Sequence, residues 1–275
     1  MSYIVERLIE TGGILAVLWA FSVWFEWHNL FKPTRKITTT PKDKGLEFED
    51  VTFVAEDGKL LHGWWIPHPD ATGTILYCHG NADCLSGRVD LCADLHQLGV
   101  NIFIFDYRGY GKSCGVPTEK GLYRDARAAY EVVRARYDDS DAPPVIVYGA
   151  SLGGAVAAQL VLERSARGLV LECTFTSVLE MGQHLYPLLP VRLVTRMRFD
   201  TLSKIGRIAI PKLVSHSRDD LLIPFDMGQR LFNAARGEKD FITLRGNHDE
   251  AGWIETPAYW TALEGFVRRH LPTAQ

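Results

Sequence analysis

The feature that most restricts the fold of this chain is a serine flanked by glycines, Gly149-Ala150-Ser151-Leu152-Gly153. A short apolar stretch, Val145–Tyr148, comes just before it, and a run of small residues follows it. This pattern is typical of a strand that turns sharply into a helix, because bulky side chains two positions from the serine would clash in the turn. The helix then directs its N-terminal N–H groups and positive dipole end toward the serine. We therefore predict that Ser151 is a nucleophile whose hydroxyl projects above a sheet.

Predicted strands and helices alternate through most of the chain. Eight apolar segments bounded by turn residues are predicted as strands: Leu46–Ala55, Leu60–Pro67, Thr74–Cys78, Val100–Phe105, Val145–Tyr148, Leu169–Glu172, Leu213–Ser215 and Phe241–Leu244. Helical periodicity is found between several of them, for example at 121–137 and 224–235, and again after the last strand at 257–270. This alternation predicts one α/β domain with a mostly parallel central sheet that helices flank on both sides.

A second motif, Cys78-His79-Gly80-Asn81, follows an earlier predicted strand. Sites built on such a serine turn hold an oxyanion with the backbone N–H after the nucleophile and a second N–H from the loop after another strand. We expect Leu152 and Asn81 to supply these two donors, with Gly80 allowing the loop to approach closely. His79 precedes the serine, which is the wrong chain order for a base in this arrangement, so a structural role is predicted for it.

These motifs, taken with three others, resemble those of a known family. The others are Asp106-Tyr107-Arg108-Gly109-Tyr110-Gly111-Lys112-Ser113, Asp220-Leu221-Leu222-Ile223-Pro224 and Gly246-Asn247-His248-Asp249. Together they make residues 46–272 similar to an α/β-hydrolase, specifically the membrane-anchored abhydrolase-domain subgroup of serine hydrolases. The resemblance implies an α/β-hydrolase fold, a small cap and a catalytic triad in the chain order Ser, Asp, His.

The same resemblance implies where the acid of the triad stands. In the family the acid lies four residues before a proline that opens the next helix. This spacing selects Asp220, with Pro224 at the helix start, and leaves Asp219 as an alternative that the chain order also permits. We expect Asp219 to be a solvated or helix-capping neighbour.

The base should follow the next predicted strand, and His248 does so after Gly246-Asn247. His270 also satisfies the chain order, but it lies beside two arginines on what is predicted to be a solvated helix face. His216 precedes the acid, at the end of a strand, and is predicted to be structural. The predicted triad is therefore Ser151, Asp220 and His248.

The N-terminal region differs from the rest of the chain. Residues 12–25 are uncharged and largely apolar, but they fall short of the ~20 residues usually needed to span a bilayer. We expect residues 1–31 to form an apolar helix that is either a single-pass or interfacial membrane anchor, or an amphipathic helix docked on the protein. Residues 32–45 are predicted to be a linker, and 46–275 the catalytic domain. Basic residues after the apolar run predict that this domain faces the cytoplasm.

Composition excludes several other classes of function. The net charge of −3 gives no strong field for nucleic acid, and the five cysteines lack the spacing of a zinc or redox site. Free thiols, and no metal or organic cofactor, are therefore expected. Gly111-Lys112-Ser113 resembles the end of a phosphate-binding loop, but Asp106 stands where that loop needs a glycine. We expect instead that Arg108 in this stretch forms a structural ion pair.

Residues 174–207 separate two predicted strands and are expected to form the cap. Its apolar side chains either line an acyl pocket or only seal the cap to the core. The leading hypothesis is a carboxylesterase that acts on a small-molecule acyl ester or lipid with a short to medium acyl chain. The alternatives are an acyl-protein thioesterase at a membrane, a peptidase, and a non-catalytic scaffold with the same fold.

Overall fold

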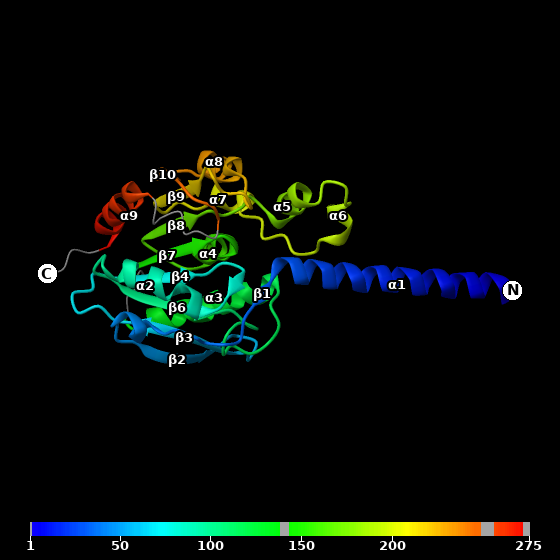
Figure 1. Cartoon of the computed structure of the whole chain (residues 1–275), viewed down its shortest axis with the longest axis horizontal. Helices are drawn as coiled ribbons and strands as arrows, with labels where there is room; N and C mark the ends of the chain where they lie inside the picture. The colour runs from blue at the N-terminus through cyan, green and yellow to red at the C-terminus, as the bar shows by residue number, and fades with distance from the viewer. Residues whose placement is uncertain (1, 138–142, 249–255, 272–275) are drawn as a thin grey trace.

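The structure is a computed structural model that describes residues 2–137, 143–248 and 256–271. Its centre is an eight-stranded sheet in the order β10-β9-β8-β7-β4-β6-β3-β2 (Figure 1). The strands are β2 (Glu49–Val54), β3 (Leu60–Ile66), β4 (Thr74–Cys78), β6 (Asn101–Asp106), β7 (Val145–Ala150), β8 (Gly168–Glu172), β9 (Lys212–Ser217) and β10 (Lys239–Leu244). β3 pairs antiparallel with β2 and β6, whereas the other neighbours pair parallel. The predicted fold class, a mostly parallel sheet flanked by helices, is confirmed.

The central strands are apolar on both faces, because helices cover both. In β4, Leu76 and Cys78 enter the core on one face, and Ile75 and Tyr77 enter a separate core on the other. The covering helices are α2 (Val89–His96), α3 (Glu119–Arg134), α4 (Leu152–Glu163), α8 (Phe225–Ala234) and α9 (Pro257–His270). Side chains of α3, α4 and α8 belong to the first core, and those of α2 and α9 to the second. The continuous apolar runs read from the sequence follow from this two-sided burial.

The segment between β8 and β9 contains three short helices, α5 (Val178–Leu185), α6 (Val191–Val194) and α7 (Leu202–Ile205). The side chain of Ser177 accepts a hydrogen bond from Glu180 N at 3.1 Å and so caps the start of α5. The segment occupies the range predicted for the cap. In Figure 1, α5 and α6 lie beyond the edge of the sheet, on the same end of the molecule as the N-terminal helix.

The N-terminal helix α1 (Ser2–Leu30) projects away from the sheet, with the N-terminus at its far end (Figure 1). Among the helices that the structure describes, none is both long and apolar enough to cross a membrane. Several apolar side chains of α1 are nevertheless more than half exposed: Ile14, Val17, Leu18, Trp19, Phe21 and Trp24.

Residues 32–45, predicted to be a linker, instead pack against the catalytic domain. They contain β1 (Lys32–Pro33), which pairs parallel with β5 (Ala82–Asp83), and the 3-10 helix η1 (Pro41–Lys44). A second 3-10 helix, η2 (Leu85–Arg88), follows β5, and the hydroxyl of its Ser86 accepts a hydrogen bond from Thr38 N at 2.8 Å. The local sequence predicts a linker because these residues are polar. It does not show their hydrogen-bond partners, which lie about 50 positions away in the chain.

Candidate active site

Ser151 occupies a strained turn between β7 and α4. Its φ of 52° lies in the left-handed region, which residues with a side chain seldom adopt. The two flanking glycines are required by close packing. A Cβ at Gly149 would collide with the carbonyl oxygen of Gly153, and a Cβ at Gly153 would collide with that of Cys78. The turn therefore has the geometry that the sequence pattern predicts, with the serine immediately before the first residue of a helix.

The structure brings the three residues of the predicted triad together. His248 Nε2 lies 3.1 Å from Ser151 Oγ, and His248 Nδ1 lies 2.7 Å from Asp220 Oδ2. Ser151 follows β7, Asp220 lies in the turn after β9, and His248 lies in the loop after β10. Because these parallel strands end at the same edge of the sheet, residues separated by up to 97 positions meet there.

Asp220 is held as a carboxylate. Burial by itself raises the pKa of this carboxyl, but hydrogen bonds from His248 and from two backbone N–H groups outweigh burial and leave the pKa below its usual value. The backbone donors are Leu222 N at 2.9 Å and Ile223 N at 2.8 Å, both to Oδ1. The second oxygen is thereby left to His248, so the imidazole is oriented by an anion.

The alternative residues lie elsewhere. Asp219 Oδ2 accepts a hydrogen bond from Gly246 N at 3.3 Å, and its other oxygen lies 3.6 Å from Arg245. His270 Nε2 lies 3.3 Å from Glu238 Oε1. The spacing argument that selected Asp220 over Asp219 agrees with these positions.

The two histidines predicted to be structural are fully buried. His216 Nε2 lies 2.9 Å from the carbonyl oxygen of Ile223, and burial lowers the pKa of the imidazole. His79 contacts the carbonyl oxygen of Gly80 at 2.7 Å, and burial lowers its pKa to about 3. Both imidazoles are therefore neutral at pH 7 and hold loops that border the site.

The loop with the second predicted oxyanion donor lies against the nucleophile. A Cβ at Gly80 would be 3.5 Å from Ser151 Cβ, so the backbone passes close to the serine. Leu152 is the first residue of α4, and the first N–H groups of a helix have no partner within it. Within the part of the chain that the structure describes, Asn81 N–H has no acceptor either. Both predicted donors are thus unpaired beside Ser151.

A cavity of about 400 Å³ opens beside Ser151, between the cap and α1. The cap contributes mostly apolar side chains to it: Phe175, Val178, Met181, Leu185, Tyr186, Leu189, Val191 and Val194. The last turns of α1 form the opposite wall, with Phe25, Glu26, Asn29 and Leu30. Of the two alternatives for the cap residues, lining a pocket is the one that this cavity supports.

The contact between α1 and the cap is specific. Glu26, which is buried, accepts hydrogen bonds from Arg196 N at 2.7 Å and Met197 N at 2.6 Å, both at Oε1. Tyr186 donates to Asn29 Oδ1 at 2.7 Å, and its ring meets that of Phe25 edge-on. The sequence analysis named no residue of α1 as a catalytic or oxyanion residue, although it left open that this segment docks on the protein. The glutamate at the end of an apolar run was the one local signal that could have suggested it.

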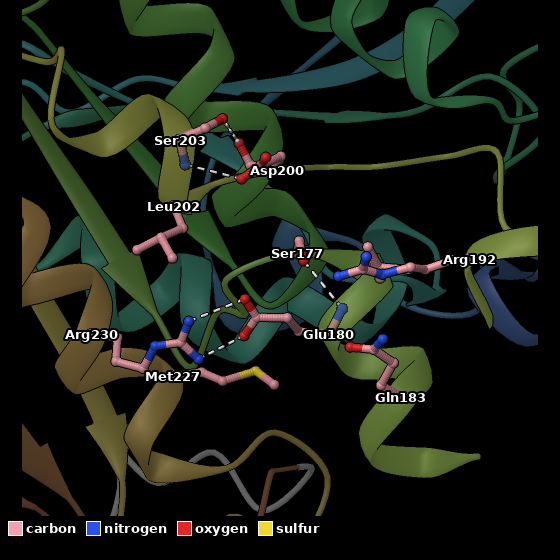
Figure 2. Close-up of a pocket in the computed structure, with 10 residues that line it drawn as sticks. Ser177, Glu180, Gln183, Arg192, Asp200, Leu202, Ser203, Met227 and Arg230 are labelled. Atoms are coloured by element: carbon pink, nitrogen blue, oxygen red, sulfur yellow. Dashed lines mark hydrogen bonds and ion pairs between the residues drawn. The ribbon is translucent and has the colours of Figure 1, made fainter. Parts of the chain in front are cut away.

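A second cavity, of about 630 Å³, lies against a different face of α5 (Figure 2). It is more polar, and Glu180 and Arg230 form a two-point ion pair beside it, with the shorter contact at 2.6 Å (Figure 2). Arg230 belongs to α8, so this pair ties the cap to the body of the domain. The residues of the triad do not line this cavity.

The other sequence expectations concern metals, thiols and ion pairs. Among the described residues, no group of three or more His, Cys, Asp or Glu side chains is arranged to hold a metal. All five cysteines are free, and only Cys114 is exposed. Arg108 forms the structural ion pair predicted for it, with Asp125 and Asp57, each at 2.8 Å.

Comparison with known proteins finds relatives that are named as hydrolases, a lipase or an esterase. A family model described as serine aminopeptidase, S33, matches residues 69–201. The chain is 30% identical to the alpha/beta hydrolase domain-containing protein WAV2 of Arabidopsis thaliana, covering 99% of this chain and 97% of that protein. It is 34% identical to the lysophosphatidylserine lipase ABHD12 of Rattus norvegicus, over 73% of this chain and 57% of that one. Among solved structures, the Pyrococcus furiosus esterase Pf2001 superposes with a TM-score of 0.74 at 21% identity, covering 88% of this chain and 99% of that one.

Proposed function

Because this chain belongs to the α/β-hydrolase family of hydrolases, we propose that it cleaves carboxylic esters of short to medium acyl chains with Ser151 as the nucleophile. The observation that carries the proposal is the hydrogen-bonded series Asp220–His248–Ser151 beside an apolar cavity. Nucleophile, base and orienting anion stand within hydrogen-bond distance of one another, as acyl transfer requires.

The acylation step follows from these positions. As Ser151 Oγ attacks the acyl carbonyl carbon, its proton passes to His248 Nε2. The carbonyl oxygen becomes an oxyanion, which the backbone N–H groups of Asn81 and Leu152 stabilise. The resulting imidazolium is stabilised by Asp220, whose lowered pKa keeps it ionised. When the tetrahedral intermediate collapses, His248 returns the proton to the departing alcohol, and the acyl group stays on Ser151.

Deacylation repeats the step with water. His248 takes a proton from water as the water oxygen attacks the acyl-enzyme, and the same two N–H groups hold the second oxyanion. Collapse of this intermediate releases the carboxylic acid, and the proton returns to Ser151 Oγ. Every proton transfer in this scheme uses the Nε2 atom that lies 3.1 Å from the serine.

The cavity favours an apolar acyl group, because its walls are largely apolar and, among the described residues, include only two charged ones, Glu26 and Lys32. Both hydrogen bonds that Glu26 accepts come from backbone N–H groups of the cap, so this carboxylate has a structural role in the cavity wall. The rat relative, named as a lipase, also favours an ester of a lipid type. An acyl-thioester would fit the same cavity, so the assay must separate the two.

Turnover of p-nitrophenyl esters from acetate to decanoate tests the proposal. We expect hydrolysis with an optimum at a short or medium chain, covalent labelling by a fluorophosphonate, and loss of both in Ser151→Ala, with turnover down by a factor of about 10⁶. Leucine p-nitroanilide and an acyl-thioester, run beside the esters, report peptidase and thioesterase activity. Labelling that persists in Ser151→Ala would place the nucleophile at another residue.

We further propose that α1 rests on a lipid surface, so that ester substrates reach the cavity from the membrane. Its exposed apolar side chains include two tryptophans, which favour membrane interfaces. Exposed Leu188 and Leu193 of the cap add to this apolar surface. We expect the full chain to sediment with phosphatidylcholine vesicles. The Val17→Asp substitution should decrease the fraction of protein that sediments with them. Val54→Asp, at a similarly exposed valine on β2, is the matched control. Equal vesicle binding by both variants would argue against the proposal.

A further inference from the structure

We propose that the side-chain amide of Asn81 is a positioning group for catalysis: by binding the end of α1, it holds the loop that supplies the second oxyanion N–H. The proposal rests on the esterase function proposed above, in which the backbone of Asn81 is a donor. It assigns a role to the side chain and to the N-terminal segment that the sequence did not suggest.

The contact that carries the proposal joins Asn81 to the last residue of α1. Asn81 Nδ2 donates to the carbonyl oxygen of Leu30 at 3.1 Å. The final carbonyl groups of a helix have no partner within the helix, and Leu30 is the last residue of this one. The amide therefore caps the helix from a loop that lies 51 positions away in the chain.

The main chain of Asn81 is held from two further directions. Its carbonyl oxygen accepts a hydrogen bond from Lys32 N at 3.0 Å and another from the hydroxyl of Tyr110 at 2.7 Å. The next residues, Ala82 and Asp83, form β5 and pair with β1. The loop that contains Asn81 is thus joined to the N-terminal segment by the Asn81 side chain, by the hydrogen bond from Lys32 N to the Asn81 carbonyl oxygen, and by the pairing of β5 with β1.

The loop needs such support because its backbone is strained. Asp83 has a φ of 65°, in the left-handed region, where residues with a side chain are uncommon. Thr34 Oγ1 donates to Asp83 Oδ1 at 2.7 Å, and Thr34 follows β1 directly. Strained conformations persist when surrounding contacts determine them, and here the N-terminal segment provides these contacts.

The end of α1 is itself a fixed point. Phe31, the next residue, is 2% exposed, and its ring centroid lies 6.4 Å from that of Phe199 in the main core. The carbonyl of Leu30 is therefore anchored to the body of the domain. Leu30, Asn81 and Ser151 line the same cavity, so a shift of this carbonyl would be transmitted to the loop beside the nucleophile.

This arrangement predicts that loss of the Asn81 side chain weakens stabilisation of the transition state and leaves substrate binding nearly unchanged. Removing an oxyanion donor outright lowers kcat by a factor of about 10²–10³. Asn81→Ala keeps the backbone N–H and removes only its support, so we expect a smaller loss in kcat, about tenfold, with KM within about twofold of the wild type. A trifluoromethyl ketone, whose hemiketal oxyanion occupies the hole, should bind more weakly by the same factor as kcat falls.

The test uses the full chain, with initial rates on p-nitrophenyl butyrate and the Ki of the ketone. Tyr110→Phe removes a different bond to the same loop and should produce a smaller loss of the same kind. Asn233→Ala, at an exposed asparagine on α8, is the control and should leave kcat, KM and Ki unchanged. Melting temperatures of all variants separate loss of fold from loss of positioning.

The outcomes distinguish this inference from the function on which it rests. If the wild type is active and Ser151→Ala is not, unchanged kcat and Ki in Asn81→Ala would overturn the inference and leave the esterase function intact. An effect on KM alone would overturn it as well. A wild type without esterase activity would overturn both. If Asn81→Ala does not fold, Tyr110→Phe decides by the same criteria.

Discussion

Replacement of Glu26 tests whether α1 contributes to substrate binding in the cavity beside Ser151. In the folded protein the Glu26 carboxylate holds the backbone of Arg196 and Met197, which connects the cap to α1. Glu26→Ala removes both hydrogen bonds, whereas Glu26→Gln can retain an oxygen at the Oε1 position and loses only the negative charge. The pair of variants therefore separates the hydrogen bonds from the charge.

The expected magnitude follows from these two bonds. A hydrogen bond to a charged group contributes about 1.5–3 kcal/mol, but Arg196 and Met197 are partly exposed and water replaces some of the loss. We therefore expect Glu26→Ala to loosen the contact by roughly 1–3 kcal/mol and Glu26→Gln by about 1 kcal/mol or less. Since 1.4 kcal/mol corresponds to tenfold, KM for a substrate that fills the cavity should rise by about 5- to 140-fold in Glu26→Ala.

The assay compares p-nitrophenyl octanoate with p-nitrophenyl acetate. We expect the octanoyl chain, but not the much shorter acetyl group, to reach the residues of α1 that line the cavity, so KM should rise for the octanoate and stay constant for the acetate. Hydrogen exchange of peptides from 16–31 and 190–199 should accelerate in the alanine variant. The reasoning is refuted if Glu26→Ala leaves both the KM for octanoate and the exchange rates at wild-type values.

Two further predictions concern the buried acids. Asp220→Asn should lower kcat/KM by a factor of about 10⁴ without unfolding the protein, because Asp220 is the aspartate that contacts His248. Asp219→Asn should change kcat/KM less than about threefold. The reverse order of effects on the same ester would show that the acid is misassigned. Glu172 is buried and bonded to the hydroxyl of Tyr148, and burial raises the pKa of its carboxyl above the ordinary value of 4.5. The folded state therefore holds this proton at pH values where the unfolded state has released it, so the stability that Glu172 contributes falls as the pH rises above about 4.5 toward its folded pKa. Relative to Glu172→Gln, which cannot ionise, the wild-type melting temperature should decrease as the pH is raised above about 4.5. A difference that stays constant with pH would contradict the raised pKa of Glu172.

Local patterns in the sequence determined much of the sheet and the choice of triad candidates. Continuous apolar runs such as Thr74–Cys78 are buried on both faces, so composition alone marks them, and the structure has β4 at those residues. Ser151 could be selected because the two glycines and the small residues stand within a few positions of it in the sequence, although Gly153 is required by a contact with the distant Cys78. Asp220 was selected by the resemblance to the family, through its spacing from Pro224, which is also a local feature. Each of these signals lies in one short window of the chain.

The sequence left the place of the N-terminal segment open, for the opposite reason. Residues 1–31 were predicted to be a membrane anchor or a helix docked on the protein, and their partners are distant in the chain. Glu26 binds residues 170 and 171 positions away, and Leu30 binds a residue 51 positions away. An apolar run has the same composition whether it enters a membrane, lies on one, or lines a cavity. Periodicity within the run cannot report which surface it meets.

What the sequence by itself determined is therefore most of the sheet, together with the candidate residues for the triad and their order in the chain. Only the tertiary structure decided that α1 closes the cavity, that the supposed linker is packed, and that Asn81 joins its loop to the end of α1. The physical reason is the range of the interactions. Backbone turns and strand burial depend on neighbouring residues, whereas a hydrogen bond between distant segments depends on the path of the whole chain, which places each donor opposite its acceptor.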